Sequence, residues 1–179
     1  MPAPGHIALV AGLVSSSYFT FGNIGLAFCG IMPAIARGQT TLPVADRVVL
    51  WEFFYEAGKL HMLGASVMSA VALSVSAYLS SAGPLRNVAA AGAVAAYTSI
   101  AFTLLFLLPV NNDLIAMLKA NAVKSMGPKE EHALDQLDKW RALHRVRIVL
   151  GLISWLASAT ALLATDAIIK PSISLKTNH

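Results

Sequence analysis

Four long stretches of this chain contain no Asp, Glu, Lys or Arg. They cover residues 7–36, 60–85, 87–112 and 148–165. A helix needs about 20 apolar residues to cross the hydrocarbon core of a bilayer. Unpaired backbone groups are too costly in lipid, so such stretches fold as helices rather than as open strands. The chain is therefore predicted to be all-α, a four-helix transmembrane bundle forming a single domain over residues 1–179.

Composition supports a membrane protein and argues against other classes. Hydrophobic residues make up 56% of the chain and charged residues only 12%, against about 25% charged in soluble domains. The net charge of +4 would suggest a nucleic-acid partner in a soluble chain. Here the charges are too few, and no basic helix is free of apolar neighbours, so no nucleic-acid partner is expected. The one cysteine, Cys29, cannot form an intramolecular disulfide.

Local signals predict where the first two helices end and begin. The first span is expected to end near Met32 and Pro33. The second helix should begin around residues 43–46, where a proline precedes an acidic first turn. It should then run to Leu79, which makes it an extended helix that projects past the membrane surface.

Similar signals bound the other two helices. Gly83 and Pro84 are expected to form the turn into the third helix, and Pro109 to close or kink it. The fourth helix should begin near Asp138 and run to Ile169, because its charge-free stretch is short for a full crossing.

The distribution of basic residues predicts the orientation. Ten of the Lys and Arg residues lie on the side of the two longer loops, and three lie on the other side. Loops rich in Lys and Arg remain in the cytosol. The chain is therefore expected to be a multi-pass integral membrane protein with cytosolic larger loops and both termini outside or in a lumen.

The fourth helix carries a polar motif at its cytosolic end. Trp140, His144 and Arg147 are spaced by four and three residues, which places them within about 60° of one another on one helical face. Arg141 and Arg145 fall on another face, where they are expected to anchor the helix at the membrane boundary. An ionisable pair on one stripe at a membrane boundary indicates a functional site.

The second helix carries a parallel motif. Trp51 and Tyr55 share one stripe, and Glu52, Glu56 and Lys59 lie on a neighbouring stripe. Like charges four residues apart on a helix repel. The repulsion between the two glutamates is expected to be relieved locally by Lys59 or, across the bundle, by Arg147. A solvated helix end is the alternative interpretation.

Three asparagines are further candidates. Asn111 and Asn112 follow Pro109 closely. They either cap a helix that ends there or form hydrogen bonds with polar groups of neighbouring helices. Asn23 lies in the middle of the first span, where an amide usually faces the bundle interior. It is expected either to hold helices together or to contact a substrate.

The sequence contains no motif for a metal or an organic cofactor. It has no HExxH, no paired CxxC motifs, no phosphate-binding glycine loop and no serine nucleophile elbow. His61, His144 and Glu56 would meet only through tertiary packing. No metal and no bound cofactor are therefore expected.

Three motifs in order along the chain resemble the anthrone oxygenase family, small four-helix membrane proteins of polyketide pathways. They are Trp51-x-x-x-Tyr55-x-x-Gly58, Pro109-x-Asn111-x-x-Leu114 and Trp140-x-x-x-His144-x-x-Arg147. The resemblance covers nearly the whole chain. It implies a monooxygenase that oxidises an anthrone, a small aromatic polyketide, to an anthraquinone. Molecular oxygen would be the co-substrate, with no flavin or nicotinamide. For a filamentous fungus it also implies an endomembrane or vesicle membrane.

The candidate residues suit that chemistry. His144 is the expected base, since an unperturbed imidazole has a pKa of about 6.5. Arg147 stays charged and suits the enolate oxygen, and Asn111 and Tyr55 are expected to donate hydrogen bonds to oxygen. The remaining expected substrate contacts are Trp140, Trp51, Asn112, Asn23 and Glu56.

Two alternatives remain open at this stage. One is an oxidase assisted by a metal or haem that uses His61 or His144 as a ligand. The other is a non-catalytic four-helix membrane protein, either a small transporter or an assembly partner of a polyketide enzyme. Under the leading interpretation, an apolar substrate would enter sideways from the membrane lipid. The sequence leaves a homo-oligomer open.

Overall fold

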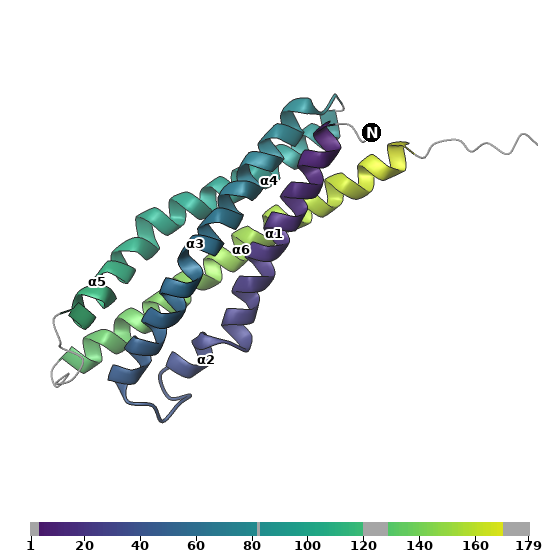
Figure 1. The fold of residues 1–179 in the computed structure, drawn as a ribbon. Helices are drawn as coiled ribbons and strands as arrows, with labels where there is room; N and C mark the ends of the chain where they lie inside the picture. The colour runs from purple at the N-terminus through teal and green to yellow at the C-terminus, as the bar shows by residue number, and fades with distance from the viewer. Residues whose placement is uncertain (1–3, 82, 120–128, 170–179) are drawn as a thin grey trace, which may run out of the picture.

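The chain folds into a bundle of long helices (Figure 1). The structure is a computed structural model that describes residues 4–81, 83–119 and 129–169. Its elements are α1 (Pro4–Phe28), α2 (Ile31–Ile35), α3 (Val44–Leu79), α4 (Gly83–Phe102), the π-helical segment η1 (Thr103–Leu107), α5 (Leu108–Lys119) and α6 (Glu130–Ile169). Over these described residues, four helical stretches are long and apolar enough to cross a membrane. The predicted all-α four-helix bundle is confirmed.

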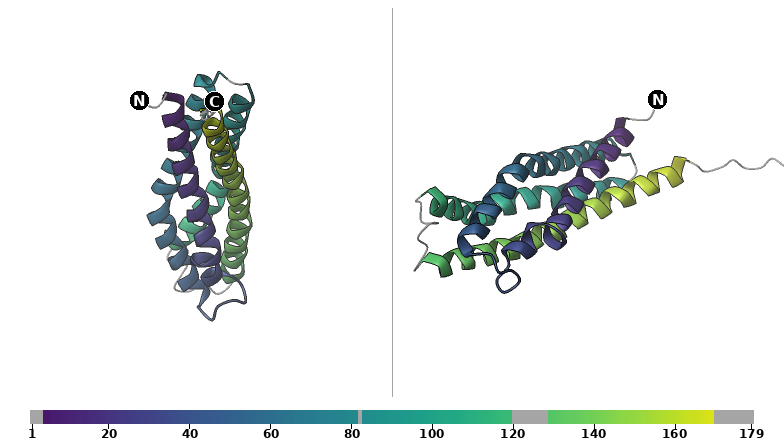
Figure 2. Two further views of the ribbon diagram at one scale, coloured as in Figure 1. Left: turned by 90° about the vertical axis from the view of Figure 1, so that its right-hand side faces the viewer. Right: turned by 60° about the horizontal axis from the view of Figure 1, so that its bottom comes forward.

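The four long stretches form a closed ring. Both α1 and α4 pack against α3 and α6. The start of α1, the α3–α4 connection and the end of α6 lie at one end of the bundle (Figure 2). The short helix α2, the end of α5 and the start of α6 lie at the other end. This second end carries the ends of the helices that flank the two longer loops, the side that the charge distribution assigns to the cytosol. That orientation stays a prediction.

The extended second helix is confirmed. Helix α3 runs without a break from Val44 to Leu79. It includes the segment 51–59, and it continues through two glycines. A Cβ atom added at Gly58 or Gly64 would meet nothing within 4 Å. These glycines therefore leave the helix intact and leave open space on its surface.

The first membrane-crossing stretch, Pro4–Ile35, ends close to the predicted Met32 and Pro33, but the sequence did not predict that its helix is interrupted. Helix α1 ends at Phe28, and Met32 and Pro33 belong to α2. The break falls at Gly30, where an added Cβ would lie 2.8 Å from the Cα of Leu26. Only glycine fits so close to the preceding turn. Proline is tolerated in the first turn of α2, because the N–H groups there have no partner within the helix.

The third helix starts at residues that the sequence predicts as a turn, and it continues past Pro109, which the sequence predicts to close or kink it. Gly83 and Pro84 are the first residues of α4 rather than a turn. Pro109 does not close the helix, which continues as α5 to Lys119. A proline removes a backbone donor and crowds the carbonyl four residues earlier. The π-helical turn η1 directly before Pro109 provides the wider turn that accommodates it.

Helix α6 begins at Glu130, eight residues before the predicted start, and ends at Ile169 as predicted. The additional turns are held by tertiary contacts that the charge-free pattern does not show. Ala133 and Leu137 are fully buried in the apolar cluster that also contains Trp51 and Leu114. Packing therefore stabilises a helical start whose other positions are mostly polar or charged.

Two arginines hold the α2–α3 connection in place. Arg37 pairs with Glu131, Asp135 and Asp138 of α6, at 2.7, 2.7 and 3.2 Å. Its hydrogen bond and charge contacts with these carboxylates raise its pKa. Arg47 is buried and donates to three carbonyl oxygens of the connection, those of Ala36, Thr40 and Leu42. The connection is thereby tied to both α3 and α6.

Candidate functional site

A cavity of about 250 Å³ lies between α1, α3, α6 and the α4–η1–α5 stretch. Its wall is mainly apolar, and a few polar side chains converge on it. The apolar lining includes Phe19, Leu26, Phe54, Leu63, Ile100, Leu104, Leu107 and Trp140. Such a cavity suits a flat apolar ligand held by a small number of polar contacts.

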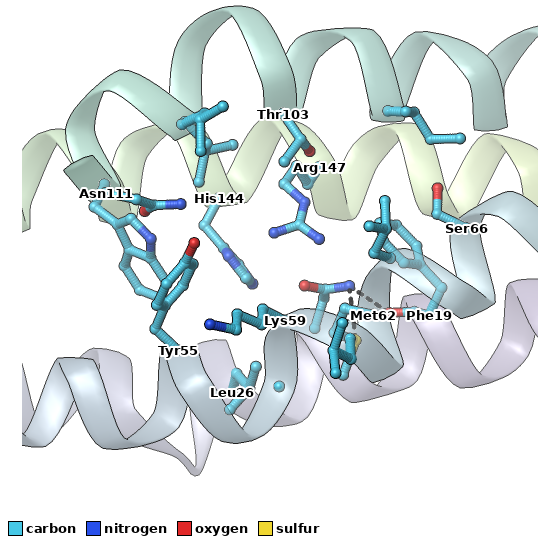
Figure 3. A pocket seen from close by; sticks show the side chains of 18 of the residues that line it. Phe19, Leu26, Tyr55, Lys59, Met62, Ser66, Thr103, Asn111, His144 and Arg147 are labelled. Carbon is cyan, nitrogen blue, oxygen red and sulfur yellow. Dashed lines mark hydrogen bonds between the residues drawn. The ribbon is translucent and has the colours of Figure 1, made fainter. Parts of the chain in front are cut away.

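The structure brings the four predicted catalytic residues to this one cavity. Tyr55 comes from α3, Asn111 from α5, and His144 and Arg147 from α6. In Figure 3, His144 and Arg147 point into the space that Tyr55 and Lys59 line from the opposite side. The geometry shows their convergence, and their chemical roles stay predictions.

His144 is buried without a hydrogen-bond partner. Only 2% of its surface is exposed, and neither ring nitrogen has a partner among the described residues. The imidazole lies against the indole of Trp140, one turn earlier on α6, with ring centroids 5.0 Å apart. Buried polar atoms normally have partners. The two free nitrogens are therefore available to a ligand in the cavity.

Arg147 places a cation at the same cavity. Its guanidinium lies over the ring of Phe19, 5.3 Å from the ring centroid, and its buried Nε has no partner in the described part of the chain. Within the described part of the chain, no Asp or Glu side chain lies within ion-pair distance of Arg147. Glu56, which could have paired with it, forms an ion pair with Lys59 at 2.5 Å instead. The glutamate repulsion on α3 is thus relieved locally, and the Arg147 charge is left for a ligand.

Asn111 lies inside a helix rather than at a helix end. Helix α5 continues past it to Lys119, so the capping interpretation is wrong. The Asn111 side chain is 5% exposed, and its Oδ1 has no partner among the described residues. Tyr55 is held beside it by stacking on Trp51, at a centroid distance of 5.1 Å and an interplanar angle of 9°.

Asn23 is fully buried and lines the cavity from α1. Its Nδ2 donates to the backbone oxygen of Phe19 at 2.5 Å and contacts the sulfur of Met62 at 3.7 Å (Figure 3). Its Oδ1 has no partner in the described residues. Asn23 therefore links α1 to α3 through its nitrogen and also offers an acceptor at the cavity.

Three predicted substrate contacts do not line the cavity. Trp51 is fully buried behind Tyr55 and packs edge-on against Trp140, with centroids 6.3 Å apart. Glu56 is half exposed and paired with Lys59. Asn112 is exposed, because successive residues of a helix point about 100° apart and its neighbour Asn111 faces inward. Of the two predicted tryptophan faces, only Trp140 reaches the cavity.

Several lining residues escaped sequence analysis. Met62, Ser66 and Thr103 line the cavity. Lys59 lines it as well, although the sequence analysis predicted for it only an ion pair with a glutamate. Lys59 could have been found, because it lies one turn after Tyr55 on the same helix. Ser66 and Thr103 gave no such signal, since small hydroxyl side chains are common in apolar spans and bond to their own backbone.

Two observations bear on ligation of a metal. Over the residues that the structure describes, no three His, Cys, Asp or Glu side chains are grouped to hold an ion. His61 is exposed on α3 and lines a different hollow from His144. The two histidines therefore do not share a site.

Comparison with known proteins gives one family. The sequence profile described as anthrone oxygenase matches residues 51–164, more than half of the chain. The matched region includes the candidate residues of α3, α5 and α6, and it leaves out α1 with Asn23. No significant match is found among curated proteins or among solved structures.

Proposed function

The chain belongs to the anthrone oxygenase family, and we propose that it oxidises an anthrone to an anthraquinone with molecular oxygen and no bound cofactor. One observation carries the proposal. A buried histidine with two free ring nitrogens, His144, lines an apolar cavity together with Arg147, a cation that has no carboxylate partner among the described residues. This pairing suits removal of a carbon-bound proton and stabilisation of the resulting oxyanion.

Proton transfer is the first step. An anthrone carries a CH₂ group between two aromatic rings, opposite a ketone, so loss of one proton gives an electron-rich anthranolate. His144 takes this proton on a ring nitrogen. Arg147 donates hydrogen bonds to the oxygen on which the negative charge accumulates. An apolar cavity strengthens this interaction, because little water competes for either charge.

Oxygen then reacts with the anthranolate. The anion passes one electron to O₂, and the resulting carbon radical and superoxide combine into a peroxide anion at the former CH₂ carbon. The imidazolium returns its proton to the terminal oxygen. Loss of the remaining C–H proton to His144 and cleavage of the O–O bond give the second ketone and hydroxide, which is protonated to water. One oxygen atom thus enters the quinone and the other leaves as water.

The other polar groups assist with the peroxide and with orientation. Asn111 and Tyr55 donate hydrogen bonds to the peroxide oxygens from α5 and α3. Trp140 offers a flat face to the ring system and positions the His144 imidazole, which lies against it. Asn23 offers its free Oδ1 to a hydroxyl group of the substrate. Trp51 acts indirectly, by supporting Tyr55 and Trp140.

Oxygen uptake by the purified full chain tests the proposal. The protein in detergent is mixed with emodin anthrone in an oxygen electrode, and quinone formation is followed by absorbance. Protein-free detergent gives the spontaneous rate, which is subtracted. We expect a rate proportional to protein concentration and one O₂ consumed per quinone formed.

Two outcomes would favour the alternative functions, a non-catalytic membrane protein or a metal- or haem-assisted oxidase. Folded protein that adds nothing to the spontaneous rate would indicate a non-catalytic membrane protein. A rate that chelators abolish and one added metal restores would indicate a metal-assisted oxidase, as would a haem band in the absorption spectrum.

A further inference from the structure

A second hollow, of about 410 Å³, lies on the outer side of the bundle between α1 and α3. Three glycines of the α1 region line it, namely Gly22, Gly25 and Gly30, together with the exposed residues Cys29 and His61. Both flanking helices belong to stretches that can cross a membrane. We call this hollow the lateral groove.

The lateral groove and the main cavity share part of their walls. Leu26, Phe54, Gly58 and Met62 line both spaces. Gly58 contributes no side chain to this shared wall, so three side chains from α1 and α3 form the partition. Displacing one of them would connect the outer groove to the space that contains His144.

Met62 is the most easily displaced part of this wall. Its terminal methyl occupies the notch at Gly22, where an added Cβ would lie only 2.7 Å from it. Its sulfur is held by a weak contact with Asn23 Nδ2 at 3.7 Å. Methionine is unbranched and flexible, and its sulfur is a weak acceptor. Moving the side chain out of the notch therefore breaks only one weak polar contact among those seen in the described residues.

We propose that the lateral groove admits a flat, apolar aromatic substrate from the bilayer, and that Met62 moves aside to let it reach the cavity. The identity of the substrate rests on the proposed function. The shape of the groove supports a flat ligand, because an added Cβ at Gly25 or Gly58 would meet nothing within 4 Å. The absence of these two side chains leaves room along the wall.

A pair of glycine substitutions tests the route. Gly25→Leu adds a side chain at the groove, where an added Cβ meets nothing within 4 Å, and Gly25 itself does not line the main cavity. Gly64→Leu is the matched control, since it lies on α3 in equally open space and lines neither hollow. Both are reconstituted in phosphatidylcholine vesicles with emodin anthrone as the substrate.

Substrate access contributes to kcat/KM, whereas kcat describes steps after binding. We expect Gly25→Leu to lower kcat/KM about tenfold with kcat within about twofold of wild type, and Gly64→Leu to leave both unchanged. Equal kcat/KM values in the two variants, in protein that turns over, would overturn the route.

A second readout is independent of turnover. Cys29 is the only cysteine in the sequence, and it lines the lateral groove. We expect 1,8-dihydroxyanthraquinone in the vesicles to slow the reaction of Cys29 with N-ethylmaleimide, and to slow it less in Gly25→Leu. Labelling that the quinone does not change would count against the groove as a binding site.

The two readouts separate the two proposals. Protection of Cys29 by the quinone in a chain that shows no oxygen uptake would support the groove and remove the proposed function. Oxygen uptake without protection, and without an effect of Gly25→Leu, would support the function and remove the groove.

Discussion

Replacing His144 by leucine should abolish turnover while leaving the fold as stable as before or more stable. The imidazole is 2% exposed, and both of its nitrogens lack partners among the described residues. A buried polar group without a hydrogen bond costs about 1–3 kcal/mol of stability. A swap to an apolar residue of similar volume usually costs less than about 1.5 kcal/mol. The first effect is the larger, so the free energy of unfolding should stay level or rise.

The catalytic effect has the opposite sign. Loss of a general base typically lowers the rate by about 10² to 10⁴. A residue that is needed for catalysis but lowers stability should, when replaced, reduce the rate without reducing the free energy of unfolding. A histidine that serves only packing would instead lower stability when replaced and leave turnover intact.

Both quantities are measured on the same detergent-solubilised preparations. Denaturant unfolding followed by tryptophan fluorescence gives the stability, and the oxygen electrode gives the rate above the spontaneous oxidation. Arg145→Ala is the control, because Arg145 is one residue away on the exposed face of α6 and should change neither value. Near wild-type turnover in His144→Leu would refute the role as base. A loss of more than about 2 kcal/mol would refute the reasoning on unpaired nitrogens.

Three further predictions concern the surroundings of the site. Arg147→Lys should lower kcat/KM at least about tenfold, because an ammonium cannot reproduce the planar guanidinium fork. The control variant Arg145→Lys should leave kcat/KM unchanged. Equal kcat/KM values for the two variants in oxygen-uptake assays would contradict this prediction. Trp51→Ala should cost about 3–5 kcal/mol of unfolding free energy. Trp51→Phe should cost much less, because it also removes a buried N–H that has no partner in the described part of the chain. A raised KM without a stability loss in Trp51→Ala would instead indicate direct substrate contact. Arg37→Ala should leave turnover unchanged and increase amide exchange in α2 and the connection that follows it. Because the pKa of Arg37 is raised by its hydrogen bond and charge contacts with the carboxylates of α6, its charge is kept throughout the neutral range, and the difference from wild type should be the same across that range. Equal exchange in the variant and the wild type would show that Arg37 does not order this region.

The helices and their membrane-crossing lengths could be predicted from the sequence, because backbone N–H and C=O groups in lipid must form hydrogen bonds within the protein. A long stretch without charges has to satisfy its own hydrogen bonds, and the helix does so. The spacing of Trp140, His144 and Arg147 likewise determined a shared face, because a helix of regular pitch brings residues four and three apart together.

Other features depended on what packs against each helix. The earlier start of α6 is held by Ala133 and Leu137, which are buried in an apolar cluster with residues of α3 and α5. These contacts are not visible in the local pattern. Asn111 faces inward and Asn112 outward, and the sequence could not tell which of the two would do so, because the π-helical segment η1 interrupts the regular pitch ahead of them.

Tertiary packing also decided which aromatic side chains face the cavity. Trp51 and Trp140 occupy equivalent places in their motifs, yet Trp51 is covered by Tyr55 while Trp140 remains at the wall. Tertiary packing also decided how the charged side chains pair. Glu56 forms an ion pair with Lys59, and Arg147 has no carboxylate partner among the described residues. Sequence spacing determines which side chains share a face of one helix, but neighbouring helices determine whether that face is covered, paired or open to a ligand.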